Sequence, residues 1–117
     1  MKIPIYQVDA FTDKLFSGNP AAVCVLEDWL PNKVLQSIAL ENNLSETAFI
    51  KNESNGYNIR WFTPEAEVNL CGHATLATAR ILFDDYLDED ISEVTFYSKS
   101  GELKASKDNQ KIYLDFP

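Results

Sequence analysis

The run GHATLATARILF at residues 72–83 places the strongest constraint on what this chain can fold into. After His73, Arg80 is its only residue that is certain to carry a charge, so a helix formed here is apolar almost all round. Such a helix is normally buried on every side. Its alanines allow the backbone of a sheet to approach closely, and twelve residues are too few to cross a bilayer. The sequence therefore predicts a central helix wrapped by strands.

Patterns before and after this segment predict the elements that surround it. A hairpin with Asn55-Gly56 at its tip joins two of the strands, and the acidic patch at 84–90 returns the chain to solvent. A first helix at 31–43 has Pro31 in its first turn. Together these patterns indicate an α+β domain with a mixed, mostly antiparallel sheet wrapped around a buried central helix. The predicted strands lie at residues 2–10, 21–26, 47–51, 57–62, 94–98, 102–106 and 111–116.

The acidic composition excludes several classes of function. The 117 residues carry a formal net charge of −8, and Lys and Arg occur as scattered single positions, which argues against a nucleic-acid partner. No run reaches the roughly 18 apolar residues of a membrane span, and the N-terminus lacks the apolar region of a signal peptide. Cys24 and Cys71 are far apart, and with one histidine they do not make a structural zinc site. These features predict a cytoplasmic protein with free thiols and no metal.

Two segments carry candidate catalytic groups. Glu46 lies at the mouth of a predicted strand, and Cys71-Gly72-His73-Ala74 opens the buried helix. The first amides of a helix lack intrahelical acceptors, so a carboxylate can dock there, helped by the missing side chain of Gly72. Histidine is the side chain best suited to acid/base chemistry at neutral pH, so His73 can form an acid/base pair with Glu46. From the residues alone, an alternative stays open in which His73 caps or packs, Glu46 is solvated and Cys71 fills the core.

Four strings bear on this choice: VDAFTDKLFSGNPAAVCVL, NNLSETAFI, RWFTP and EVNLCGHATLATARILF. In their order and spacing they resemble the successive signature segments of the phenazine-biosynthesis (PhzF)-like isomerases. That family has the diaminopimelate-epimerase-like fold, in which two pseudo-symmetric α+β domains each wrap a sheet around a central helix. The resemblance thus implies the same buried helix that the apolar pattern at 72–83 predicts by itself.

The resemblance also implies a chemistry and the residues that perform it. The best-understood member isomerises a cyclohexadiene that carries an amino and a carboxylate group, and it uses no metal or organic cofactor. By the matching motifs, Glu46 is the proton-shuttling base and His73 assists it. Gly72 and Ala74 supply amides that hold the substrate carboxylate, and Asn19 lines the cleft.

Further expectations concern Cys71 and the domain organisation. Related epimerases have a cysteine base at the position of Cys71, so epimerisation or racemisation through this thiol is a second hypothesis. A non-catalytic carboxylate-binding or interaction module is a third. By the resemblance, residues 1–117 are a single domain that corresponds to the family's N-terminal half, while relatives continue through a second domain that completes the cleft. The chain is thus expected to hold half of an active site, completed by that second domain or by another copy in a homodimer.

Overall fold

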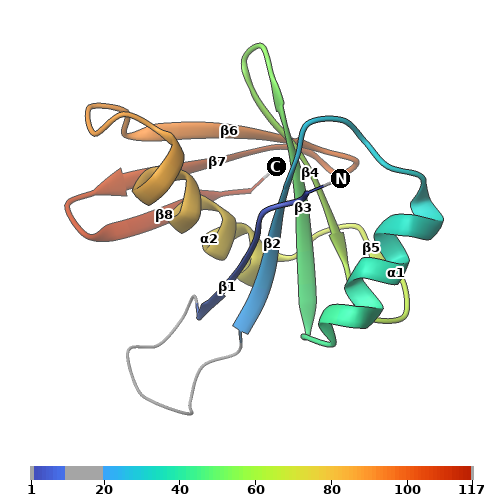
Figure 1. Ribbon diagram of the computed structural model, residues 1–117. Helices are drawn as coiled ribbons and strands as arrows, with labels where there is room; N and C mark the ends of the chain where they lie inside the picture. The colour runs from blue at the N-terminus through green and yellow to red at the C-terminus, as the bar shows by residue number, and fades with distance from the viewer. Residues whose placement is uncertain (1, 10–19, 117) are drawn as a thin grey trace.

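The computed structural model describes residues 2–9 and 20–116. Eight strands of this part form one sheet in the order β1-β2-β3-β4-β6-β7-β8, with the short β5 paired to β4 (Figure 1). In chain order the elements are β1 (Ile5–Asp9), β2 (Pro20–Leu26), α1 (Asn32–Asn42), β3 (Glu46–Glu53), β4 (Gly56–Phe62), β5 (Glu67–Val68), α2 (Gly72–Ile81), η1 (Leu82–Tyr86), β6 (Glu93–Ser98), β7 (Gly101–Asp108) and β8 (Lys111–Asp115).

The sheet is mixed and mostly antiparallel, as the sequence predicts. β2 and β3 pair in parallel, as do β4 and β6, and the other neighbouring strands are antiparallel. The sheet curls around α2, which contacts β1 and β2 at one end of the strand order and β8 at the other (Figure 1). The predicted fold class, a sheet wrapped around a central helix, is confirmed.

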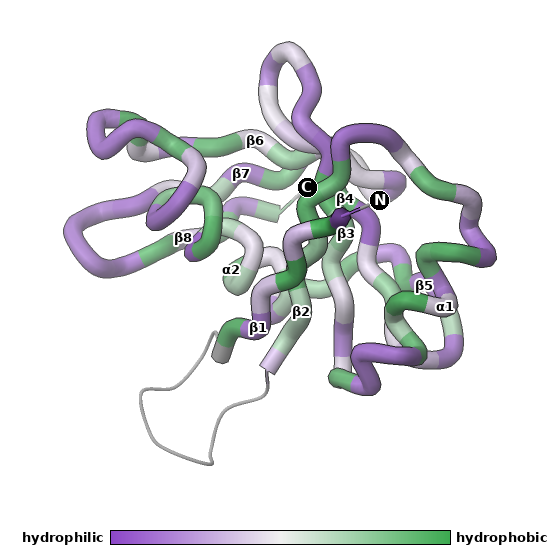
Figure 2. Tube along the Cα trace, in the orientation of Figure 1, coloured by the Kyte–Doolittle hydropathy of each residue, from purple (hydrophilic) through white to green (hydrophobic). Residues whose placement is uncertain are grey.

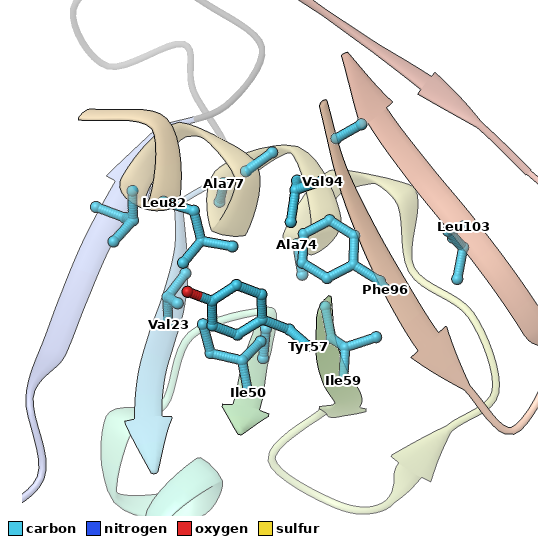
Figure 3. Close-up of a cluster of buried hydrophobic side chains, with 14 of the residues drawn as sticks. Val23, Ile50, Tyr57, Ile59, Ala74, Ala77, Leu82, Val94, Phe96 and Leu103 are labelled. Atoms are coloured by element: carbon cyan, nitrogen blue, oxygen red, sulfur yellow. The ribbon is translucent and has the colours of Figure 1, made fainter. Parts of the chain in front are cut away.

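The central helix is buried, as its composition predicts. Ala74, Ala77 and Ala79 are fully buried. They pack in the main core with apolar side chains of the sheet such as Ile50 and Phe96 (Figure 3). Because alanine adds little beyond the helical backbone, the strands can approach the helix closely without leaving voids.

The helix is longer than predicted and ends in a wider turn. Residues Leu82–Tyr86 continue it as the π-helical turn η1. Within this turn Leu82 and Phe83 stay buried, whereas Asp84 and Asp85 are exposed. The acidic patch thus reaches solvent at Asp84 as predicted, while the helical segment extends past its predicted end at residue 83, because one wide turn holds both apolar side chains in the core.

α1 covers the opposite face of the sheet. Its Leu35 and Ala39 are fully buried and pack against Phe49 of β3 and Phe62 of β4 in a second core. Pro31 was predicted to lie in the first turn of this helix. It is instead the N-cap, and its carbonyl accepts the first helical hydrogen bonds. β3 and β4 are therefore buried from both sides, by α2 on one face and α1 on the other.

Several strand ends differ from the predicted boundaries because pairing extends past the apolar runs. β3 and β7 are each longer at both ends than predicted, whereas β1 is shorter and begins at Ile5 instead of residue 2. β5 consists of two residues, too short for any periodicity, and the sequence does not reveal it. Figure 2 shows hydrophilic residues concentrated before β6 and between β7 and β8, outside the two cores. No helix within the described ranges is long and apolar enough to cross a membrane.

The β3–β4 hairpin turns one residue earlier than predicted. Glu53 pairs with Gly56, so the turn residues are Ser54 and Asn55. Gly56 is instead the first residue of β4, where a Cβ atom would lie 2.3 Å from the carbonyl oxygen of Thr95. Glycine is thus required at this position by the close approach of β6 and not by the turn.

An ion pair holds β5 against β4. The guanidinium of Arg60 donates from Nε and Nη2 to the two carboxylate oxygens of Glu67, each over 2.8 Å. It also lies 5.4 Å and 5.3 Å from the ring centroids of Trp29 and Phe62. Lys99 adds a second ion pair to Glu67 over 3.0 Å. The hydrogen bonds from Arg60 lower the pKa of Glu67 below its ordinary value, and the pair fixes the segment that leads into α2.

We expect Glu67→Gln to lower the free energy of unfolding by about 1 kcal/mol at pH 7, because the carboxylate keeps its partners in the folded state alone. The folded pKa is depressed, so this stabilisation is complete above the unfolded value of about 4.3 and is lost as the pH falls through the folded value. Urea unfolding at pH 7 and pH 3 measures it, with the exposed Glu65→Gln as the matched control. Equal losses in the two variants at pH 7 contradict this role of Glu67.

Candidate active site

Glu46 lies on the face of β3 that packs against α2. Side chains alternate along a strand, and Ala48 and Ile50 of β3 belong to the core around α2, whereas Phe49 belongs to the core beneath α1. Glu46 is two residues before Ala48 and shares its face. It pairs with Ala21 at the start of β2, which places the carboxylate at one end of the parallel strand pair. The predicted position of Glu46 at the mouth of a buried strand is thus what the structure has.

Cys71, at the start of α2, lies close to the carboxylate of Glu46. It is the N-cap of the helix, in an extended conformation. Burial raises the pKa of the Cys71 thiol, the backbone amides of Ala74 and His73 oppose this effect, and the carboxylate of Glu46 adds to it. The thiol thus lies within range of both the first-turn amides and the carboxylate of Glu46. The thiol is therefore protonated at neutral pH, beside a carboxylate that disfavours its ionisation.

Two polar groups near this point are withdrawn from solvent. Atom Oε2 of Glu46 is buried and accepts no hydrogen bond from the part of the chain that the structure describes. Both ring nitrogens of His73 are buried as well. Native proteins satisfy nearly all buried polar atoms, and exceptions occur where a ligand or a catalytic role supplies the partner. The Oε2 atom of Glu46 is such an exception among the described residues. The catalytic roles of Glu46 and His73 stay predictions.

The space beside Gly72 is occupied. The ring of Phe116 packs on this residue so closely that a Cβ atom at Gly72 would lie 3.1 Å from Cζ of the ring. The side of Gly72 on which a side chain would lie is therefore filled by this ring. Asn19, the other predicted substrate contact, lies outside the described residues.

The sequence analysis missed two residues that support the start of α2. Trp61 of β4 donates a hydrogen bond from Nε1 to Oγ1 of Thr75, and Thr75 in turn donates to the carbonyl oxygen of Cys71. Both belong to signature strings, RWFTP and GHAT, but neither residue type by itself indicates a link across the core. Among residues 2–9 and 20–116 there is no group of three or more His, Cys, Asp and Glu side chains placed to hold a metal ion.

The fold is that of the epimerase-like α+β proteins. A hydroxyproline epimerase from Agrobacterium vitis, solved with bound trans-4-hydroxy-L-proline, superposes with a TM-score of 0.66 over 96% of this chain and 40% of that chain. The two sequences are 10% identical, so this likeness concerns the fold alone. The class is thus an α+β fold in which a sheet curls around a central helix.

Within this class the chain belongs to the phenazine biosynthesis-like protein family (PhzC-PhzF), whose model matches residues 8–115. A PhzF-family phenazine biosynthesis protein from Enterococcus faecalis is 56% identical and superposes with a TM-score of 0.93, over 100% of this chain and 45% of that chain. A protein named as an uncharacterized isomerase in Pseudomonas aeruginosa is 52% identical over 117 residues, which are 100% of this chain and 45% of that protein. The family predicted from the four strings is confirmed, and the chain spans about half the length of these relatives.

We expect Glu46→Gln to lower the pKa of Cys71, because it removes the negative charge that disfavours the thiolate. At pH 8 the larger thiolate fraction should speed alkylation of Cys71 by iodoacetamide about threefold. Peptide mapping by mass spectrometry separates Cys71 from Cys24, whose pKa burial raises to about 12. Glu41→Gln, on the exposed side of α1, should leave the rate unchanged. An unchanged rate in Glu46→Gln means that the two side chains are not neighbours in solution.

Proposed function

We propose that this chain contributes the Glu46 side of an active site for cofactor-independent proton transfer on a small cyclic substrate that carries a carboxylate. The observation that supports this most directly is the buried Oε2 atom of Glu46, which lacks a hydrogen-bond donor within the described ranges and lies beside the N-cap of α2. A buried carboxylate in this state is costly unless a ligand interacts with it. Relatives named as isomerases support the same reaction class.

In the proposed reaction Glu46 removes a proton from a carbon next to the substrate carboxylate. The electron pair of the broken C–H bond moves into the adjacent unsaturated system, and Glu46 returns the proton at a second carbon, so the substrate keeps its composition and charge. The amides at the start of α2, from Gly72 to Ala74, stabilise the substrate carboxylate, and His73 assists the proton transfer from its buried position. Asn19 is a further proposed substrate contact.

A second candidate function is epimerisation through Cys71. The specific observation in its favour is that the first-turn amides of α2 act on the thiol and oppose the rise in its pKa. Both cysteines are free, and a catalytic thiol requires a reducing compartment, which supports a cytoplasmic location. This candidate differs from the first in one respect that can be measured, the inversion of configuration at the exchanging carbon.

Glu46→Gln should abolish the incorporation of solvent deuterium into a substrate, because the amide cannot accept the proton. The expected loss is at least about 100-fold, the usual contribution of a general base. NMR in D₂O with a panel of cyclic amino carboxylates measures exchange, and chiral chromatography of the same samples detects inversion. Glu41→Gln is the matched control, with the same change on the exposed side of α1. Exchange that persists in Glu46→Gln overturns its role as base, and inversion that disappears in Cys71→Ala supports the second candidate.

The other half of the site is proposed to come from a second domain or from another copy of this chain. Two apolar side chains lie at the start of α2, Leu70 and Phe116, and they are 44% and 47% exposed. A partner surface placed over them would cover these residues and close a cleft above Glu46. If two copies complete the site, light scattering at micromolar concentration should give the mass of two chains. The mass of one chain leaves the second domain as the partner.

A further inference from the structure

Two buried side chains connect the sheet to the first turn of α2. Trp61 is 1% exposed and Thr75 is fully buried. Nε1 of Trp61 donates to Oγ1 of Thr75 over 3.0 Å, and Oγ1 of Thr75 donates to the carbonyl oxygen of Cys71 over 2.7 Å. The backbone N of Thr75 donates to the same oxygen over 3.1 Å. The N-cap residue is thus attached to a tryptophan of β4 through one hydroxyl group.

The direction of these hydrogen bonds is determined by the donors available. A hydroxyl group has one proton, and an indole N–H can donate but cannot accept. The indole therefore takes a lone pair of the Thr75 oxygen, and the hydroxyl proton is directed to the Cys71 carbonyl. Since both residues are buried, water cannot replace either bond. The backbone of Cys71 is held at a fixed place relative to Trp61.

Glu46 is carried by β3, the strand that neighbours Trp61 of β4. Trp61 pairs with Ala48 of β3, two residues after Glu46 and on the same face of that strand. The carboxylate and the indole are thus carried by adjacent strands of one hydrogen-bonded ladder. The sheet holds Glu46, and the Trp61–Thr75 link holds Cys71 with the amides of His73 and Ala74. We propose that Trp61 and Thr75 are positioning residues, which fix the start of α2 relative to Glu46 for the proton transfer proposed above.

A neighbouring threonine shows what distinguishes Thr75. Thr78 is also fully buried in α2, and its hydroxyl donates to the carbonyl of Ala74 over the same 2.7 Å, four residues back. Such bonds to the preceding turn are common for threonine in helices and do not indicate a special role. Only Thr75 also accepts a bond from the sheet among the interactions described here. Thr78 is therefore a matched control of equal burial and equal helical bonding.

The test measures how strongly Glu46 acts on the Cys71 thiol, using iodoacetamide as the probe. Among the described residues, the charged group that acts on this thiol is Glu46 from β3, while Ala74 and His73 act on it through their backbone amides. The acceleration of Cys71 alkylation by Glu46→Gln is compared in four backgrounds: unchanged, Thr75→Val, Thr75→Ser and Thr78→Val. This cycle isolates the coupling between the two side chains from general effects on stability.

We expect an acceleration of about threefold in the unchanged, Thr75→Ser and Thr78→Val backgrounds, and less than about half of it in Thr75→Val, which keeps the shape but loses the hydroxyl. An equal acceleration in Thr75→Val and Thr78→Val overturns the proposal. If Thr75→Val does not fold, Trp61→Phe removes the donor and should give the same loss of coupling. Alkylation needs no substrate, so this test does not depend on the deuterium-exchange experiment. Exchange that persists in Glu46→Gln would contradict the proposed function only, and the alkylation rates would still decide the positioning role of Thr75.

Discussion

The burial of α2 inside the curled sheet is the constraint on which the rest of the structure depends. A helix lined with Ala74, Ala77 and Ala79 brings the strands close to its axis, and the sheet curls to cover it. Burial of the helix has a consequence for its first turn, because the unpaired amides there lie at the end of the strands and not in bulk water. In that setting a single carboxylate from β3 and one thiol are sufficient to define a polar site.

The curl of the sheet has a recognisable origin at the join between β4 and β6. Two residue pairs connect these strands, Tyr57 with Phe96 and Asn58 with Tyr97, after which β4 pairs with β5 instead. Gly56 allows the close approach that begins this join. Trp61, in the later part of β4, therefore lies where its indole can donate a hydrogen bond to Thr75 of α2. The same divergence of strands that closes the core also connects the sheet to the candidate site.

The sequence predicts most of the fold because one segment, residues 72–83, is informative by itself: its apolar surface requires surrounding strands. Glu46 and His73 were candidates from the residues, and the resemblance implied their catalytic roles; Glu46 is the first residue of β3 and His73 lies in the first turn of α2. The π-helical turn and the two-residue β5 were not predictable, since tertiary packing and not local pattern decides them. The Trp61–Thr75 bond joins residues fourteen positions apart, and no periodicity indicates such a pair.

The geometry also bears on which of the two proposed reactions this chain can support by itself. Inversion at a carbon needs a base on one face of the substrate and an acid on the other. Glu46 acts on the Cys71 thiol, so in the proposed site the two groups would lie on the same side of a substrate. A proton that is removed and returned on one face requires only that side, and the raised pKa of Cys71 keeps the thiol protonated next to the carboxylate. Of the two proposed reactions, isomerisation would use groups that this chain itself carries, while epimerisation would need an opposing group from the other half of the cleft.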